Sequence, residues 1–512
     1  MEIKGIKKIF GASAFACFIL VAAAVWLGGL NQDEGWYLYA ANLVSEGRMP
    51  YRDFFYTQGP LLPIAYSPFR FVWDCAGLLG ARIFTALIGV AGIFAASCFA
   101  GDLVERGKSR IARLTVFILL ACNLYHIYYV SIPKTYALAA LSLSLGFWFF
   151  VKALKSDGAV NRYFMIAVSA AMFAFAAGAR ISLGLFLPVS ALVLLFNFSD
   201  FRWSFLFFGL GGLLGLMAVY GAFLCDREAF EGLLAAQRYH AARGGFSPVL
   251  VVGSLSRLVR WYLPLLIVAG TAVLCGGVKA YFRDAGAAVR VSAIAALSGV
   301  FAVFALQMSA PCPYDDYQVP LAGMFAAVST AVFLSAPPKG AFLEPRVSLL
   351  FVLGLSSAVS FGSPLLQEWM CDGQDRFWPV RKGKSELALL REAAREIDRL
   401  DPGGGSLLTQ DVYLAVETGR RVPEGLEMGP FSILSDDEWR RLLLTTDIPL
   451  AALSGYTFAV DPPVCGERPL DEQLEFWNIL KSRYSYAGKI DRFGQNATTL
   501  LFLKLAGGEC AR

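Results

Sequence analysis

A series of long apolar runs constrains this chain more than any other feature, because most of them approach the roughly 20 residues that a helix needs to cross a bilayer. The runs cover residues 9–30, 78–100, 114–132, 135–151, 164–179, 181–198, 203–224, 257–276, 291–310, 319–335 and 347–366. Of the 512 residues, 56% are hydrophobic and only 17% are charged, whereas soluble domains carry about 25% charged residues. The sequence therefore predicts a mainly α polytopic membrane protein with about eleven transmembrane helices.

The basic residues predict the orientation of these spans. With the N-terminus in the cytoplasm, every cytoplasmic segment carries Lys or Arg, as the positive-inside rule requires. Merging the two runs that meet at Arg180 would move the last basic loops outside, so we count two spans there. We interpret the first run as a retained span and not as a cleaved signal peptide. A large first loop, 31–77, and everything after residue 366 are then extracytoplasmic.

The sequence predicts two domains, a membrane domain of residues 1–366 and a small soluble α/β domain of residues 367–512. In the second, "SELALLREAAREIDRL" repeats apolar residues at helical spacing, and "SLLTQDVYLAVETG", "AALSGYTFAV" and "NATTLLFLKLA" are typical of strands and turns. Cys371 and Cys465 could form a disulfide there if the domain is extracytoplasmic.

Several classes of site are disfavoured by composition. The ten cysteines include no Cys-x-x-Cys pair and the chain has only two histidines, His126 and His240, so a zinc or iron–sulfur site is not expected. No block of basic and aromatic residues indicates a nucleic-acid partner.

The stretch "NQDEGWYLYAANLVSEGRMPYRDFFYTQGPLLP" directly follows the first apolar run. It begins with two adjacent carboxylates, Asp33 and Glu34, at the membrane surface, where charge costs free energy unless something uses it. One interpretation is structural: acids stabilise the N-terminus of a helix, which Asn31 would cap. The other is catalytic.

The segment from Asp33 to Gly47 places apolar residues on one helical face and predicts an amphipathic helix that lies at the membrane interface. The acidic pair after the first span, this interfacial helix ending in glycine, and "PYRDFFYTQGPLLPIAYSPF" resemble the first extracytoplasmic loop of GT-C glycosyltransferases. The resemblance is closest to the branch of protein O-mannosyltransferases and lipid A aminoarabinose transferases. It covers the membrane region in outline, and its motifs are concentrated in Asp33–Pro68. It implies a transferase that moves a sugar from a polyprenyl-phosphate donor to a lipid, glycan or protein acceptor on the outer face of the bacterial cytoplasmic membrane.

The resemblance also implies roles for the acidic pair. Asp33 would be the general base that takes the proton of the acceptor hydroxyl, and attack in one step would invert the anomeric configuration. Glu34 would be a second acid or a structural partner of the site, and we favour the partner.

Two cations at predicted outer turns are candidates for the donor phosphate. Lys134, in "SIPKTYA", would either contact the phosphate or extend to the interface from a helix end. Arg180 lies between two apolar runs, where an arginine is costly in lipid. For Arg180 we favour phosphate binding.

Five further residues are candidates for substrate binding: Asp53, Tyr56, Arg238, His240 and Tyr317. Four of them have a structural alternative: a surface ion pair for Asp53, a solvated amphipathic helix for Arg238 and His240, and, for Tyr317, a helix start in "PYDDYQVP" that Asp315 or Asp316 would cap. His240 also competes weakly with Asp33 as the base.

One departure from the family concerns metal. Relatives often place an acid in the second outer loop, where it helps to hold a divalent cation, and this chain has none there. The sequence predicts no tightly bound metal and leaves open a divalent cation held weakly by Asp33 and Glu34. A transporter or flippase, or a non-catalytic assembly protein, remains the alternative to a transferase.

Overall fold

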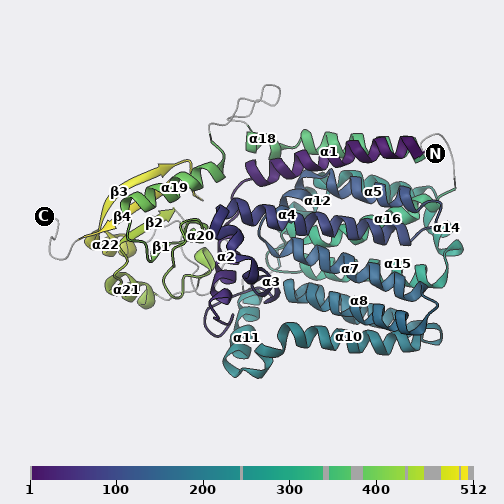
Figure 1. The fold of residues 1–512 in the computed structure, drawn as a ribbon, viewed down its shortest axis with the longest axis horizontal. Coiled ribbons are helices and arrows are strands. Elements are labelled where there is room, and N and C mark those ends of the chain that lie inside the picture. The colour runs from purple at the N-terminus through teal and green to yellow at the C-terminus, as the bar shows by residue number, and fades with distance from the viewer. Residues whose placement is uncertain are drawn as a thin grey trace.

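The computed structural model describes residues 3–242, 246–337, 345–370, 384–432, 436–454, 474–494 and 498–505. Figure 1 shows a bundle of long, roughly parallel helices at one end and a small domain with a sheet at the other. The helix α2 (Gln32–Ser45) lies between them.

Seven helical segments in the described residues are long and apolar enough to cross a membrane. They contain α1 (Ile3–Leu27), α3 (Leu61–Tyr66) continued through η1 (Ser67–Phe69) into α4 (Arg70–Asp102), α7 (Thr135–Lys155), α8 (Ala159–Ala179), α10 (Phe198–Cys225), α15 (Ala287–Met308), and η3 (Asp315–Gln318) continued into α16 (Val319–Ser335). Their apolar runs are the reason that they form spans and not surface helices. The protein is a polytopic membrane protein.

Three more segments pass the same test only as bent pairs of helices. The pairs are α5 (Ser109–Ala121) with α6 (Leu124–Ser131), bent by 75°; α12 (Pro248–Trp261) with α13 (Leu263–Leu274), bent by 86°; and α17 (Pro345–Phe361) with α18 (Pro364–Met370), bent by 46°. At the first bend, the side chain of Asn123 caps α6 by accepting from the His126 amide. These pairs raise the possible number of spans to ten.

One of the eleven expected spans, residues 181–198, is shorter than the others. Residues 181–198 correspond to η2 (Ile181–Leu185) and α9 (Phe186–Phe196), which together form a short apolar helix. The remaining helices of this region are α11 (Arg227–Ala242) and α14 (Gly277–Asp284). Every apolar run of the sequence therefore has a helical counterpart. In the described residues, length and composition support seven to ten spans, and the eleventh counterpart is the shorter apolar helix at Ile181–Phe196.

The C-terminal region forms the expected small α/β unit. Its helices are α19 (Glu386–Leu400), α20 (Val412–Glu417), η5 (Gly429–Phe431), α21 (Asp436–Thr445) and α22 (Leu474–Arg483), and its strands are β1 (Leu407–Thr409), β2 (Leu450–Ser454), β3 (Tyr484–Asp491) and β4 (Thr498–Lys504). The strand order is β1-β2-β4-β3, with β1 and β2 parallel and the other two pairings antiparallel. "VYLAVE", which we expected to be strand-like, is a helix, and Cys371 and Cys465 lie outside the described residues.

The C-terminal unit packs directly on α2, the helix that carries Asp33. A Cβ atom added to Gly35 would lie 2.2 Å from the Tyr413 amide nitrogen, so only glycine allows this approach. The Val422 amide donates to the Tyr39 hydroxyl at 3.1 Å, and the Leu30 amide donates to Glu386 at 2.6 Å. Apolar residues of α2 and of the C-terminal unit form one core. Because both faces of α2 are covered, it does not lie on the membrane as the amphipathic helix that we expected.

A second contact lies where the chain turns into the membrane. Gly77 has φ +62°, which kinks α4, and the Leu78 amide just after the kink donates to the Glu417 carboxylate at 2.7 Å. The C-terminal unit thus supplies a cap for the N-terminus of the spanning part of α4.

The stability of the C-terminal unit is expected to fall as pH rises from about 4 to about 6. Burial raises the pKa of Asp411 from 3.8 to about 6, against opposing hydrogen bonds from Ser454 and Tyr413. Between these values the folded state binds more protons than the unfolded state, so raising the pH costs about 3 kcal/mol in total. Thermal unfolding of the full chain at several pH values should show this loss, and Asp411→Asn should flatten it. An equal pH dependence in both proteins would contradict the assignment.

Candidate functional site

A polar cavity of about 450 Å³ opens where α2 meets the bundle. Its walls come from the start of α2, the first loop, the end of α6, the start of α7, the residue after α8, α11, the 314–317 segment and η5. Four residues that the sequence singled out line it together: Asp33, Lys134, Arg180 and Tyr317. These residues are far apart in the chain, so the fold brings them together.

Asp33 occupies the first turn of α2 with its carboxylate held from two sides. The Asn31 side chain caps the helix by accepting from the Asp33 amide at 3.0 Å. The Trp36 indole N–H donates to Asp33 Oδ1 at 3.1 Å, and Lys134 Nζ lies 2.8 Å from Oδ2. The side chain remains 19% exposed, toward the cavity. Asp33 therefore lies at a helix N-terminus, as the structural interpretation expected. It is also accessible from the cavity, as a catalytic role requires.

Lys134 joins two carboxylates. It precedes α7, its side chain is 8% exposed, and its Nζ lies 2.9 Å from Asp316 Oδ2 as well as 2.8 Å from Asp33. The Tyr136 hydroxyl donates to the same Asp316 oxygen at 2.8 Å. Burial opposes the charge on Lys134, but Asp316 and Asp33 outweigh burial and raise its pKa well above the usual value. Lys134 thus points into the site and does not extend to the membrane interface.

Arg180 is a buried cation of a different kind. It ends α8, and its guanidinium lies 4.2 Å from the centre of the Tyr317 ring and 5.0 Å from that of Tyr136. Its Nε makes no hydrogen bond, and among the described residues it has no carboxylate within ion-pair distance. A buried charge without a counter-charge is costly. The geometry therefore favours an anionic ligand at Arg180.

The 315–318 segment contributes more than its sequence suggested. We weighed Asp315 and Asp316 mainly as helix caps, but the structure shows no side-chain cap on η3. Instead Asp316 holds Lys134, and Asp315 accepts from Arg257 at 2.7 Å and from the Tyr125 hydroxyl at 2.7 Å. The alternation of acid and tyrosine in "PYDDYQVP" was the signal available, and it did not reveal the partners.

Glu34 faces away from the cavity. Its fully buried carboxylate binds Arg82 at 2.6 and 2.7 Å and accepts from the Asn31 amide, which completes a capping box. Arg82 also donates to the backbone carbonyls of Val25, Gly28 and Gly29. Of its two expected roles, the geometry supports the structural partner, which ties α2 to α4 and to the end of α1.

Four other candidates are not among the residues that the structure places in the cavity. Asp53 pairs with Arg52 at 2.8 Å, which lowers its pKa to about 2, and it accepts from the Met49 amide. Tyr56 is buried in an aromatic cluster with Trp36 and Tyr37 behind the cavity wall. Arg238 is exposed on α11. We therefore withdraw these three from the site, and the side chain of His240 lies outside the described part of the chain.

The carboxylates present do not fit a divalent cation. Glu34 is engaged by Arg82, so it cannot share a cation with Asp33. Between Asp33 and Asp316 lies the Lys134 ammonium group, within 3 Å of both. Among the described residues, no three His, Cys, Asp or Glu side chains form a metal-binding group.

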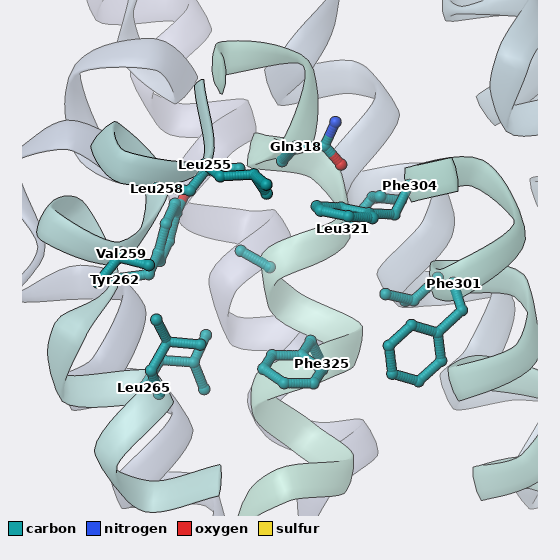
Figure 2. Close-up of a pocket in the computed structure, with 13 residues that line it drawn as sticks. Leu255, Leu258, Val259, Tyr262, Leu265, Phe301, Phe304, Gln318, Leu321 and Phe325 are labelled. Carbon is teal, nitrogen blue, oxygen red and sulfur yellow. The ribbon is translucent and has the colours of Figure 1, made fainter. Parts of the chain in front are cut away.

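An apolar groove of about 260 Å³ begins beside the polar cavity. Figure 2 shows its walls, which are mainly leucine, valine and phenylalanine side chains from α12, α13, α15 and α16, together with Tyr262 between α12 and α13 and with Gln318 at one end. Gln318 directly follows Tyr317, which lines the polar cavity. A polar site next to an apolar groove suits a ligand with a charged head and a hydrocarbon chain.

Comparisons with known proteins bear on the fold. No family model and no curated protein matches the sequence. Among solved structures, ArnT from Cupriavidus metallidurans bound to undecaprenyl phosphate aligns over 99% of both chains with a TM-score of 0.64 and 13% identity. The apo oligosaccharyltransferase of Archaeoglobus fulgidus aligns over 87% of this chain and 69% of its own, with a TM-score of 0.50 and 11% identity. The chain therefore has the fold of these solved structures, and this fold agrees with the expectation that the sequence resemblance to GT-C glycosyltransferases raised.

Proposed function

We propose that this protein is an inverting glycosyltransferase that transfers a sugar from a polyprenyl-phosphate donor to a lipid, glycan or protein acceptor at the outer face of the cytoplasmic membrane. The observation that carries the proposal is Arg180, a buried cation without a carboxylate partner among the described residues. It stands in one cavity with the Asp33–Lys134 pair and beside an apolar groove. A lipid phosphate would supply the missing negative charge.

The donor fits the two adjoining spaces. Its hydrocarbon chain would occupy the groove of α12, α13, α15 and α16, and its phosphate would lie against Arg180 and near Lys134. The structure of ArnT, which shares this fold, contains undecaprenyl phosphate. This arrangement would leave the anomeric carbon in the polar cavity, within reach of an acceptor.

The chemistry follows from the charges in the cavity. Asp33 would accept the proton of the acceptor hydroxyl while the hydroxyl oxygen forms a bond to the anomeric carbon. The bond from that carbon to the phosphate oxygen breaks, and Arg180 and Lys134 would stabilise the phosphate that leaves with the electron pair. Because attack and departure occur on opposite sides of the carbon, the configuration inverts.

The outer face is supported by a covalent bond. Cys312, in the segment between α15 and η3, is disulfide-bonded. Disulfides persist in oxidising compartments such as the periplasm. That segment and the cavity lie at one end of the bundle, so the site would face the same compartment.

Arg180→Met is expected to weaken binding of undecaprenyl phosphate to the purified protein by about 10-fold to 100-fold, because a charge-assisted bond to phosphate is worth about 1.5–3 kcal/mol. Native mass spectrometry would measure the bound lipid. Arg227→Met is the matched control, because it removes a charge from the exposed start of α11 and breaks only a surface pair with Glu231, which contributes little. Equal binding by wild type and Arg180→Met would contradict the proposed phosphate site.

Removing divalent cations is expected to leave transfer unchanged, because the Lys134 ammonium occupies the space between Asp33 and Asp316 that a cation would need. Initial rates with and without EDTA test this. Lys134→Met should lower the rate in both conditions. A rate that is lost in EDTA and restored by Mg²⁺ or Mn²⁺ would show that a metal acts at this site.

A further inference from the structure

A second polar cavity, of about 400 Å³, lies on the other side of Arg180. It shares the side chains of Arg180 and Tyr317 and the residues Thr57 and Gln58 with the first cavity. Its remaining walls come from η2, α11, the end of α15 and the segment that follows α15. We call this space the amide chamber, after Gln58, Gln237 and Gln307, which line it.

The amide chamber contains buried polar atoms that the protein leaves unsatisfied. Gln307 is 4% exposed; its Nε2 donates to Ser182 Oγ at 2.9 Å, but its Oε1 has no partner. Gln237, on α11, has its Nε2 buried without a hydrogen-bond partner. The Nε of Arg180 is also buried without a partner. An unmade buried hydrogen bond costs about 1–3 kcal/mol. One acceptor, Gln307 Oε1, and two donors, Gln237 Nε2 and Arg180 Nε, can therefore all be satisfied by a ligand that both donates and accepts hydrogen bonds.

The chemistry of the lining restricts that ligand. None of the described residues that line the amide chamber is acidic, so a protonated amine on the ligand would find no counter-charge there. Amides and hydroxyls pair well with vicinal hydroxyl groups, and apolar side chains such as Leu306 and Ile181 offer contacts for the C–H face of a ring. The volume is within the range of small-molecule sites. An uncharged sugar ring has all of these properties.

We propose that the amide chamber binds an uncharged, hydroxyl-rich sugar ring and contributes to the choice of sugar. The inference rests on the proposed function, and it goes beyond it by naming the ring as neutral and the residues that recognise it. Because Arg180 lines both cavities, a donor with its phosphate at Arg180 can place its sugar in the amide chamber. A sugar on the acceptor has the same chemistry and can enter the same space.

The test uses the full-length protein in nanodiscs and two variants that remove only amide chemistry, Gln307→Leu and Gln237→Leu. Asn161→Leu, at the opposite and exposed end of α8, is the matched control. Thermal unfolding confirms that each variant is folded. The first probe is undecaprenyl phosphate without sugar, the second is undecaprenyl-phosphate-linked neutral hexoses, and the third is methyl hexosides added to protein already loaded with undecaprenyl phosphate.

We expect both glutamine variants to bind sugar-free undecaprenyl phosphate as wild type does and to bind a sugar-bearing probe about tenfold more weakly, because about one hydrogen bond is lost. Loss with the linked hexose assigns the amide chamber to the donor sugar, and loss only with the methyl hexoside assigns it to the acceptor. A donor sugar with a protonated amine should bind wild type at least about tenfold more weakly than its neutral counterpart when the donor ring occupies the amide chamber.

Two results would count against different claims. If both glutamine variants bind every sugar-bearing probe as tightly as wild type and Asn161→Leu, the amide chamber does not recognise sugar and the inference is overturned. If wild type binds no undecaprenyl phosphate in the first arm, the proposed function fails, and the methyl hexosides alone still test whether the amide chamber binds sugar.

Discussion

Asp33→Asn should lower the rate of sugar transfer by about 100-fold or more while the protein stays folded, because the loss of a positioned general base typically costs a factor of 10² to 10⁴. Trp36 and Lys134 contact different oxygens of Asp33, so the single asparagine carbonyl can still accept from one of them, and the side chain keeps its size and shape in the cavity. What disappears is the proposed general base, the group that would take the acceptor proton. The effect should therefore fall on the chemical step, with donor binding nearly unchanged.

Turnover and binding of undecaprenyl phosphate should be measured on the same preparations. Asp53→Asn is the matched control: it removes a carboxylate from the same loop, where the side chain pairs with Arg52 and does not line the cavity. We expect it to lose far less activity. Full transfer by Asp33→Asn would remove the base assignment, and an equal loss of donor binding would mean that Asp33 acts through the donor site.

Glu34→Gln should produce the largest loss of stability of any conservative change in the first loop. It leaves Arg82 charged, fully buried and without its carboxylate. Breaking a buried ion pair by removing one partner costs about 3–5 kcal/mol. The capping box of α2 also loses its negative charge, at the helix that positions Asp33.

Thermal unfolding in nanodiscs would show this as a clear drop in Tm, whereas transfer at a temperature where the variant is folded should be reduced less than in Asp33→Asn. Asp74→Asn is the control, because its partly exposed pair with Arg70 is expected to contribute below about 1 kcal/mol. An unchanged Tm combined with lost transfer would make Glu34 a catalytic acid instead of a structural partner.

The sequence predicted the features that depend on local patterns. Apolar runs identify the spanning helices, because lipid forces every backbone group in them to bond within the helix. The start of α2 at Asn31 follows from a capping residue before two acids. The predicted topology also placed Asp33, Lys134 and Arg180 at the outer ends of spans, and the fold brings them together in one cavity.

Contacts between distant segments could not be predicted in the same way. The pairs Glu34–Arg82 and Lys134–Asp316 join residues 48 and 182 positions apart, and no local pattern marks either pair. The expectation of an interfacial α2 failed because its composition does not reveal that the C-terminal unit covers its second face. "VYLAVE" has apolar residues that suit a strand. In the structure it forms the helix α20, which packs against α2 and α4.

The measurement that tests the central claim most directly is a mass-spectrometric inventory of lipid-linked sugars and surface glycans in cells with and without this protein, repeated with Asp33→Asn. We expect one polyprenyl-phosphate sugar to accumulate and one glycan to lose a residue, both in cells without the protein and in cells with Asp33→Asn. That result would identify donor and acceptor together. Unchanged inventories in all three strains would contradict the account, because the GT-C fold would then serve transport or assembly and not transfer.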